Sequence, residues 1–257
     1  RIVIIMKLSI STLAFYPAKI ENILEFITRE KFKYLEIVDE YPYNNLVEDD
    51  FSSYDVNLSV HAPISDVNLA SHIDRIREAS IDAMKDSFNK ANMWGADRVV
   101  VHPGSIPNMG LKFTDKILEY NRRSLLKCKS LADEYGVMMC LENMPLQDKL
   151  LYSNLEALFE FVDEELHSGI TLDVGHPHNN AYTPEEMFES SHIHHVHLSD
   201  NDGSYDMHDA LGSQNIDFVE VFNILEKKKY DEISVIEVKS LPNVYKSIEY
   251  LKDIGIL

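Results

Sequence analysis

Cysteine is scarce in this chain, and a long hydrophobic run is missing. The 257 residues include two cysteines, Cys128 and Cys140, which cannot form a disulfide framework and are expected to be buried as small apolar residues. A reducing cytoplasm is therefore the expected compartment. No stretch approaches the apolar length of a membrane span. The opening RIVIIMK is too short for a signal peptide, and Met6 is a candidate initiator, with residues 1–5 then an upstream extension.

Basic residues are also scarce. The chain has 24 Lys and Arg against 43 Asp and Glu, which gives a formal net charge of −19. A surface this negative repels phosphate backbones, so binding of nucleic acid by bulk charge is disfavoured, although a local positive patch could still achieve it. The one basic run, Lys227 to Lys229, is expected at the solvated end of a helix.

Short apolar runs alternate with amphipathic stretches along the chain. The predicted strands are residues 7–12, 34–37, 58–61, 98–102, 137–142, 169–173, 193–198 and 233–237. Residues 73–93, 114–135 and 243–257 are predicted helices, whereas the second and sixth helices are expected to be short or replaced by loop. Eight such units in about 250 residues predict an α/β fold, a (β/α)8 TIM barrel forming one domain over residues 1–257. A doubly wound open sheet is the alternative, but no G-x-G-x-x-G motif follows the first strand.

Six predicted strands end in a side chain that can bind a metal. These residues are His61, His102, Glu142, Asp173, His197 and Glu237. In a barrel such ends converge on one face, where burying them unpaired would cost several kcal/mol each. A shared cation is the simplest explanation. Two loops add further donors, since LDVGH supplies His176 and HVHLSDNDGSYDMH supplies Asp206 and His208.

Six stretches carry a resemblance to a known family. They read SVHAPISDVNLAS, VVVHPGS, CLENMP, TLDVGH, HVHLSDNDGSYDMHDALGSQNIDF and VIEV. The chain resembles the xylose isomerase-like TIM barrels, a superfamily that joins sugar isomerases and epimerases to the endonuclease IV class of DNA-repair enzymes. The resemblance runs from about His61 to Glu237, with its motifs in the expected order at the strand ends.

The endonuclease IV pattern implies three zinc ions, and all of its ligands are present. The first ion would take His61, His102 and Glu142, the second Glu142, Asp173, His197 and Glu237, and the third His176, Asp206 and His208. The isomerases and epimerases need only the second set, and in them His176 often contacts substrate. One to three divalent ions are therefore expected, with zinc first and manganese, cobalt or iron also compatible with these ligands.

Two chemistries follow from the resemblance. In an isomerase or epimerase of a small sugar or sugar phosphate, Glu142 and Glu237 face opposite sides of the substrate carbon and exchange a proton. In an endonuclease IV-type zinc phosphodiesterase acting on abasic-site DNA, the metal cluster generates a hydroxide and holds a phosphate. A non-catalytic sugar-binding barrel is a third class. The complete ligand set favours the phosphodiesterase.

The loops favour the isomerase. The loop after the second strand reads VDEYPYNNLVEDD, with five acids and no base, and the loop after His61 reads APISDVN, also without a positive charge. Without local cations, DNA binding loses the counterion-release contribution. We therefore predict a metal-dependent sugar isomerase or epimerase. Candidate substrate contacts are His176, His208, Tyr41, Tyr43 and Lys239, the lysine for a substrate phosphate.

The remaining polar residues near these motifs receive smaller roles. We expect Asn143 to orient Glu142. Most of the other nearby histidines are expected to support the site indirectly or to lie at the surface, and these are His178, His192, His194 and His195.

Overall fold

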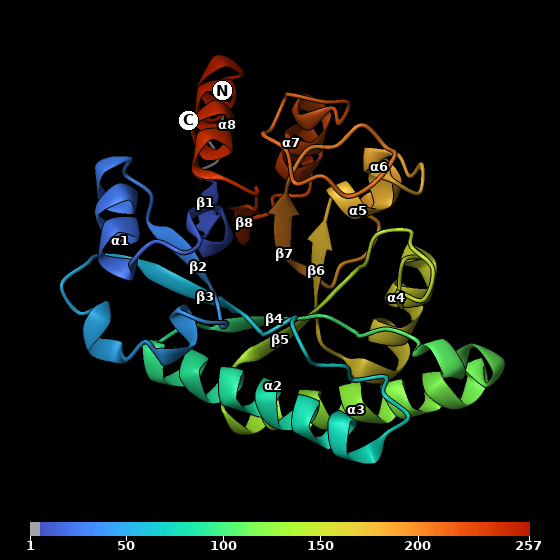
Figure 1. Cartoon of the computed structure of the whole chain (residues 1–257). Helices are drawn as coiled ribbons and strands as arrows, with labels where there is room; N and C mark the ends of the chain where they lie inside the picture. Colours follow the sequence, from blue (N-terminus) through green and yellow to red (C-terminus); the bar gives the residue numbers. More distant parts are fainter. Residues whose placement is uncertain (1–5) are drawn as a thin grey trace.

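Eight parallel strands close into a barrel in chain order (Figure 1), as the computed structural model of residues 6–257 describes it. The strands are β1 (Lys7–Ser11), β2 (Tyr34–Val38), β3 (Asn57–His61), β4 (Arg98–Val101), β5 (Met138–Glu142), β6 (Gly169–Asp173), β7 (Ile193–Leu198) and β8 (Ile233–Ile236). Each predicted strand agrees with these bounds to within one residue at either end. The predicted TIM barrel is confirmed, and the upstream extension proposed for residues 1–5 lies outside the described residues.

Helices follow most of the strands and surround the barrel (Figure 1). They are α1 (Ile20–Arg29), α2 (Asp74–Trp94), α3 (Thr114–Glu134), α4 (Leu155–Phe161), α5 (Gly175–His178), α6 (Pro184–Met187), α7 (Phe218–Lys227) and α8 (Leu241–Asp253). Two 3-10 turns, Tyr43–Asn45 and Glu48–Asp50, replace the helix after β2, and the four-residue α5 and α6 follow β6. The expected weakness of the second and sixth helices is confirmed.

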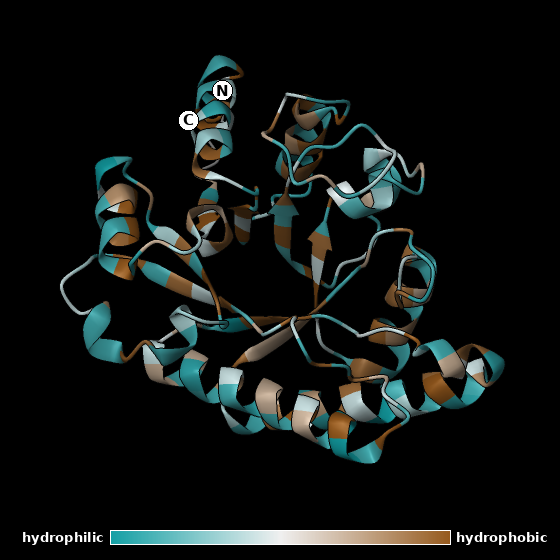
Figure 2. Ribbon diagram, in the orientation of Figure 1, coloured by the Kyte–Doolittle hydropathy of each residue, from teal (hydrophilic) through white to brown (hydrophobic). Residues whose placement is uncertain are grey.

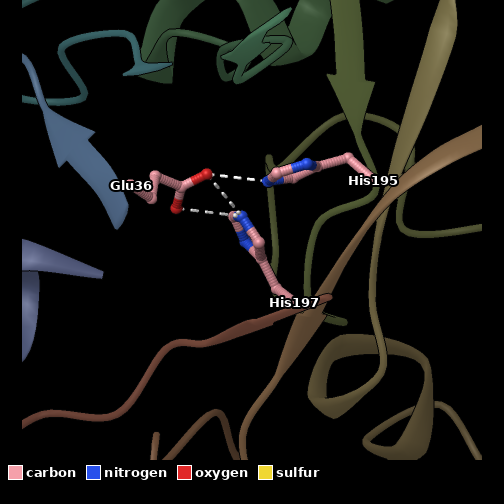
Figure 3. A group of neighbouring side chains, drawn as sticks. All are labelled: Glu36, His195 and His197. Atoms are coloured by element: carbon pink, nitrogen blue, oxygen red, sulfur yellow. Dashed lines mark hydrogen bonds and ion pairs between the residues drawn. The ribbon is translucent and has the colours of Figure 1, made fainter. Parts of the chain in front are cut away.

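Strand residues alternate between the helices and the barrel interior, as the two-residue period of a strand requires. In β2, Leu35 and Ile37 belong to the hydrophobic core packed against the helices, whereas Glu36 between them reaches across the interior to β7 (Figure 3). This alternation of hydrophobic and hydrophilic residues is visible as brown and teal bands along the strands (Figure 2). The apolar residues that stabilise the fold therefore lie between the strands and the helices, and polar side chains occupy much of the interior.

Both cysteines are fully buried, as predicted: Cys128 on α3 and Cys140 on β5. Burial raises the pKa of each thiol to about 12, so both stay protonated at neutral pH. Within residues 6–257, no helix is both long enough and apolar enough to cross a membrane.

Candidate metal centre

Four side chains meet where β5, β6, β7 and β8 end. Glu142, Asp173, His197 and Glu237 are all buried, and each offers a ligand atom within 4.8 Å of the others. Nδ1 of His197 lies 3.0 Å from Oε2 of Glu237 and 3.3 Å from Oε1 of Glu142. We call these four residues the central quartet. They come together because parallel strands place their carboxyl ends on one face of a barrel.

Glu142 also faces a second group of ligands. Its Oε2 lies 2.9 Å from Nε2 of His102 and 3.4 Å from Nε2 of His61, and the three residues form one cluster of possible metal ligands. The two oxygens of this carboxylate thus point to different sets of histidines. Such an arrangement allows one carboxylate to bridge two cations.

The outer loops bring a third group together. Oδ2 of Asp206 lies 3.0 Å from Nε2 of His208 and 3.3 Å from Nε2 of His176. Asp173 of the quartet joins His176 and His208 in a cluster whose possible ligand atoms lie within 4.8 Å. The structure therefore brings all nine predicted ligands into three adjoining clusters.

Three of the histidines are held by the backbone through Nδ1. Nδ1 of His61 lies 2.8 Å from the carbonyl oxygen of Ala62, and Nδ1 of His208 lies 2.8 Å from that of Glu237. Nδ1 of His176 lies 2.7 Å from the carbonyl oxygen of Asn143. A carbonyl can only accept, so each Nδ1 carries a proton, which leaves each Nε2 as the atom that a metal would use.

The side chain of Asn143 does not orient Glu142 as expected. Its amide nitrogen donates to the carbonyl oxygen of Asp173 at 3.1 Å, and its amide oxygen accepts from the backbone nitrogen of Asp173 at 2.9 Å. These two hydrogen bonds connect the end of β5 to the end of β6. Asn143 therefore fixes the backbone that carries Asp173, one strand away from the predicted target.

The chemistry of the donor set fits a divalent cation. Several buried atoms form no hydrogen bond of acceptable geometry, namely Oε2 of Glu142, Oδ2 of Asp173, Oδ1 of Asp206 and Nδ1 of His197. Burial raises the pKa of Asp173 to about 6, and the nearby Asp206 and Glu237 carboxylates add to this rise against the opposing His176 and His208. A shared positive ion would offset the cost of collecting these carboxylates, and mixed imidazole and carboxylate ligation suits zinc, manganese, cobalt or iron.

The three non-ligand candidates for substrate contact occupy different environments. Tyr43 is buried in the hydrophobic core, and its hydroxyl donates to the carbonyl oxygen of Ala18 at 3.0 Å. Lys239 lies with Nζ 2.5 Å from Oδ1 of Asp209. Tyr41 is 71% exposed on the loop after β2. The placement of Tyr43 is therefore corrected, since a tyrosine beside a proline at this turn packs inward as a structural residue.

Sequence reasoning missed a carboxylate inside the barrel. Glu36 on β2 is fully buried and accepts hydrogen bonds from His195 and His197, which project from β7 (Figure 3). A signal was present, because Glu36 interrupts the apolar strand YLEIV at an inward position. The other three histidines of the region lie outside the interior: His192 is 3.1 Å from Asp163, His194 is 3.5 Å from Glu232, and His178 is partly exposed.

A small cavity of about 120 Å³ lies beside His102. Its lining combines apolar side chains, among them Ile64, Val67 and Met84, with the polar Asn68 and Ser105. None of the described residues that line it is a lysine or an arginine. The cavity can therefore take an uncharged group of a few atoms next to the metal ligands.

Comparisons with known proteins agree with this architecture. The chain matches the family of xylose isomerase-like TIM barrels over residues 24–254. An uncharacterised protein of Methanocaldococcus jannaschii is 35% identical over 261 residues, which cover 96% of this chain and 89% of that relative. A solved structure of a D-tagatose 3-epimerase-like protein is 32% identical with a TM-score of 0.87, covering 97% of both chains. Endonuclease IV from Thermus thermophilus shares the fold, at 21% identity and a TM-score of 0.73 over 96% of this chain and 99% of that one.

Proposed function

We propose that this chain, which belongs to the xylose isomerase-like TIM barrels, is a metal-dependent epimerase or isomerase of a small unphosphorylated sugar. The observation that carries the proposal is the pairing of Glu142 and Glu237 around His197. Their carboxylates approach Nδ1 of His197 to 3.3 and 3.0 Å from two different strand ends. Two carboxylates beside one metal position can serve as the base and the acid of a proton transfer.

The central quartet would hold the catalytic ion through Glu142, Asp173, His197 and Glu237. A divalent ion bound there supplies a Lewis acid that polarises the carbonyl of the sugar and fixes its neighbouring hydroxyl. His176 and His208 stand at the outer edge of the site, where their Nε2 atoms face Asp206. In the epimerase these two histidines orient the sugar hydroxyls.

Both glutamates are ionised at neutral pH before a sugar binds. Burial raises the pKa of Glu142, but the neighbouring His102 and His197 outweigh it and bring the pKa well below its usual value. Burial likewise raises the pKa of Glu237, and His197 and His208 outweigh it, so that this pKa is also lowered. In the reaction one glutamate, as a carboxylate, removes the proton from the carbon next to the carbonyl. The other glutamate, after taking up a proton from solvent, donates it to the opposite face of the same carbon, and the first then releases its proton to solvent.

A neutral substrate is favoured over a sugar phosphate. The cavity beside His102 has no Lys or Arg in its described lining, and Lys239, the candidate for a phosphate contact, is paired with Asp209. A phosphate dianion needs several donors or cations to offset its loss of water. The apolar wall formed by Ile64, Val67 and Met84 instead suits a carbon-rich end of the sugar.

An endonuclease IV-type phosphodiesterase is the second candidate, and one observation favours it. The nine ligands that the endonuclease pattern implies lie in three adjoining clusters, more than an epimerase needs. The loop after β2 weighs against it, because its acids remain near the site face, and Glu40 there accepts from the backbone of Ile64 and Ser65. Duplex DNA would meet negative charge at this loop.

Incubation in heavy water separates the two functions. Metal-loaded protein is mixed with a panel of neutral ketoses and aldoses and their phosphates, and separately with abasic-site duplex DNA at low and moderate salt. We expect deuterium uptake next to the carbonyl of a neutral sugar, lost in Glu237→Gln and retained in the exposed control Glu226→Gln. Specific nicking of the abasic strand, absent from intact DNA and lost in Glu142→Gln, would instead establish the phosphodiesterase.

A further inference from the structure

A chain of hydrogen bonds continues from the central quartet into the barrel interior. His197 uses its two ring nitrogens in opposite directions: Nδ1 faces Glu142 and Glu237, and Nε2 lies 3.2 and 3.4 Å from the two oxygens of Glu36. His195 approaches the same carboxylate, with its Nε2 2.7 Å from Oε2 of Glu36. Figure 3 shows the carboxylate of β2 facing both rings of β7.

We propose that Glu36 is a positioning residue that fixes the ring of His197, so that Nδ1 is the ligand atom presented to the central quartet. For Nδ1 to bind a metal, the ring proton must sit on Nε2. Glu36 is the acceptor at that nitrogen, and it therefore selects the tautomer and the ring orientation that ligation needs. A carboxylate behind a ligating histidine also makes the ligand more basic.

The surroundings of Glu36 hold its carboxylate in one orientation. Oε2 accepts from Nε2 of His195 at 2.7 Å and from Oγ of Ser59 at 3.3 Å, and Ser59 is the neighbour of Glu36 in the β2–β3 pairing. His195 lies two residues before His197 on the same face of β7. The carboxylate is thus anchored from β3 and β7 while it contacts His197.

Two simpler structural roles explain the contacts less well. As a packing residue, a buried glutamate is unfavourable, since an apolar side chain of similar volume would fill the space without a desolvated charge. As a second cation site formed by Glu36, His195 and His197, the cluster would use Nε2 of His197 as a ligand, and that ring would then have no nitrogen left to carry a proton while Nδ1 serves the quartet. The separation of 2.7 Å between His195 and Glu36 is that of a charge-assisted hydrogen bond.

Zinc affinity tests this inference, which rests on the metal centre of the proposed function. Metal-free protein is titrated with zinc against a chelating dye, and the site containing His197 is identified by its loss in His197→Ala. We expect Glu36→Gln to weaken zinc binding at that site by about 10–100-fold. Ile37→Ala is the matched control, because the next side chain on β2 faces the hydrophobic core and its loss lowers the melting temperature without touching His197.

The ring proton of His197 gives a readout that a loss of stability would not reproduce. In zinc-loaded protein labelled with 15N-histidine, we expect two downfield Nε2 protons, from His195 and His197, because both rings face Glu36. The proton of His197 is the one that is absent from His197→Ala, and it should shift upfield in Glu36→Gln. Ile37→Ala should keep it in place. Zinc affinity and this proton both unchanged in a folded Glu36→Gln would overturn the inference while leaving the metal centre intact. A wild-type protein that binds no zinc, manganese or cobalt would overturn both.

Discussion

Oε2 of Glu142 lies 2.9 Å from Nε2 of His102, while the other oxygen of the same carboxylate faces His197. This one side chain therefore joins the central quartet to the pair formed by His61 and His102. It is buried at the end of β5, where water cannot replace either contact. Metal binding at both groups of ligands should therefore depend on Glu142.

Glu142→Gln should reduce both metal content and the stabilisation that metal provides. An amide has one acceptor oxygen and cannot offer a ligand to two sides at once. For wild-type protein, ligand at 100 times its Kd raises the free energy of unfolding by about 2.7 kcal/mol. We expect zinc to raise the melting temperature of the wild type clearly and that of Glu142→Gln little, as measured by calorimetry with and without a chelator. An equal rise in both proteins would contradict a bridging role.

The ion of the central quartet should not depend on the outer cluster of His176, Asp206 and His208. His208→Ala removes one of the two imidazoles that face Asp206 but none of the quartet. We expect anomalous scattering at the zinc and manganese edges to show the quartet ion retained in this variant, and any ion that the wild type holds in the outer cluster lost. If the wild type shows one ion, at the quartet, epimerase chemistry is favoured. Three ions within bridging distance would favour phosphoester hydrolysis.

Arg98 should stabilise the barrel most strongly at pH values above the usual pKa of Asp and Glu, where its partner carboxylates are ionised. Its buried guanidinium contacts Asp97 at 2.7 Å and Glu232 at 2.9 Å and also donates to the carbonyl oxygen of His194. A hydrogen bond from Arg98 lowers the pKa of Asp97. For Glu232, burial raises the pKa, but Arg98 outweighs it and the net shift is also downward. Stabilisation from a lowered carboxyl pKa is complete above about pH 5.5, where the unfolded-state carboxyls are also ionised, and is lost as the pH falls through the folded-state value.

The test of this pH dependence is urea unfolding of wild type and Arg98→Met at pH 7 and pH 3.5. We expect the variant to be less stable by about 2 kcal/mol at pH 7, which is the scale of a lost hydrogen bond to a charged group. The difference should shrink at pH 3.5 because protonated carboxyls no longer attract the guanidinium. A difference that stays constant with pH would mean that Arg98 acts through packing alone.

Gly104 should tolerate no side chain at the edge of the cavity beside His102. Its φ is +98°, and a Cβ there would lie 2.6 Å from Oδ1 of Asn68 and 3.1 Å from the backbone nitrogen of Leu69. The Asn68 oxygen cannot move away freely, because it accepts from the backbone nitrogens of Ala70 and Ser105. We expect Gly104→Ala to lower the free energy of unfolding by about 2–4 kcal/mol, from backbone strain plus lost hydrogen bonds.

Gly95→Ala is the matched control for this substitution. Gly95 also has a positive φ, +71°, but a Cβ there would meet nothing within 4 Å. Backbone strain alone should lower the free energy of unfolding of Gly95→Ala by about 1–2 kcal/mol. If urea unfolding shows the same loss in both variants, the close approach of Asn68 does not constrain Gly104.

The strand order and the face that bears the ligands could be predicted because both depend on local patterns. A two-residue alternation shows which side chains leave the core, and a barrel collects the carboxyl ends of its strands on one face whatever their distance in sequence. His61, His102 and Glu237 were found in this way, although they follow three different strands. The absence of a regular helix after β2 could be predicted for the same reason, since the acidic loop there has no helical period of apolar residues.

Contacts across the barrel depend on closure, which no local pattern encodes. Glu36 meets His195 and His197 because β2 and β7 face each other through the interior of a ring of fixed strand number and stagger. The inward turn of Tyr43 and the pairing of Lys239 with Asp209 likewise depend on neighbours brought in from elsewhere in the chain. The sequence alone thus identified the candidate ligands. Tertiary packing decided which carboxylate contacts the ring of His197, because a hydrogen bond requires two groups to be close in space, whatever their separation in the sequence.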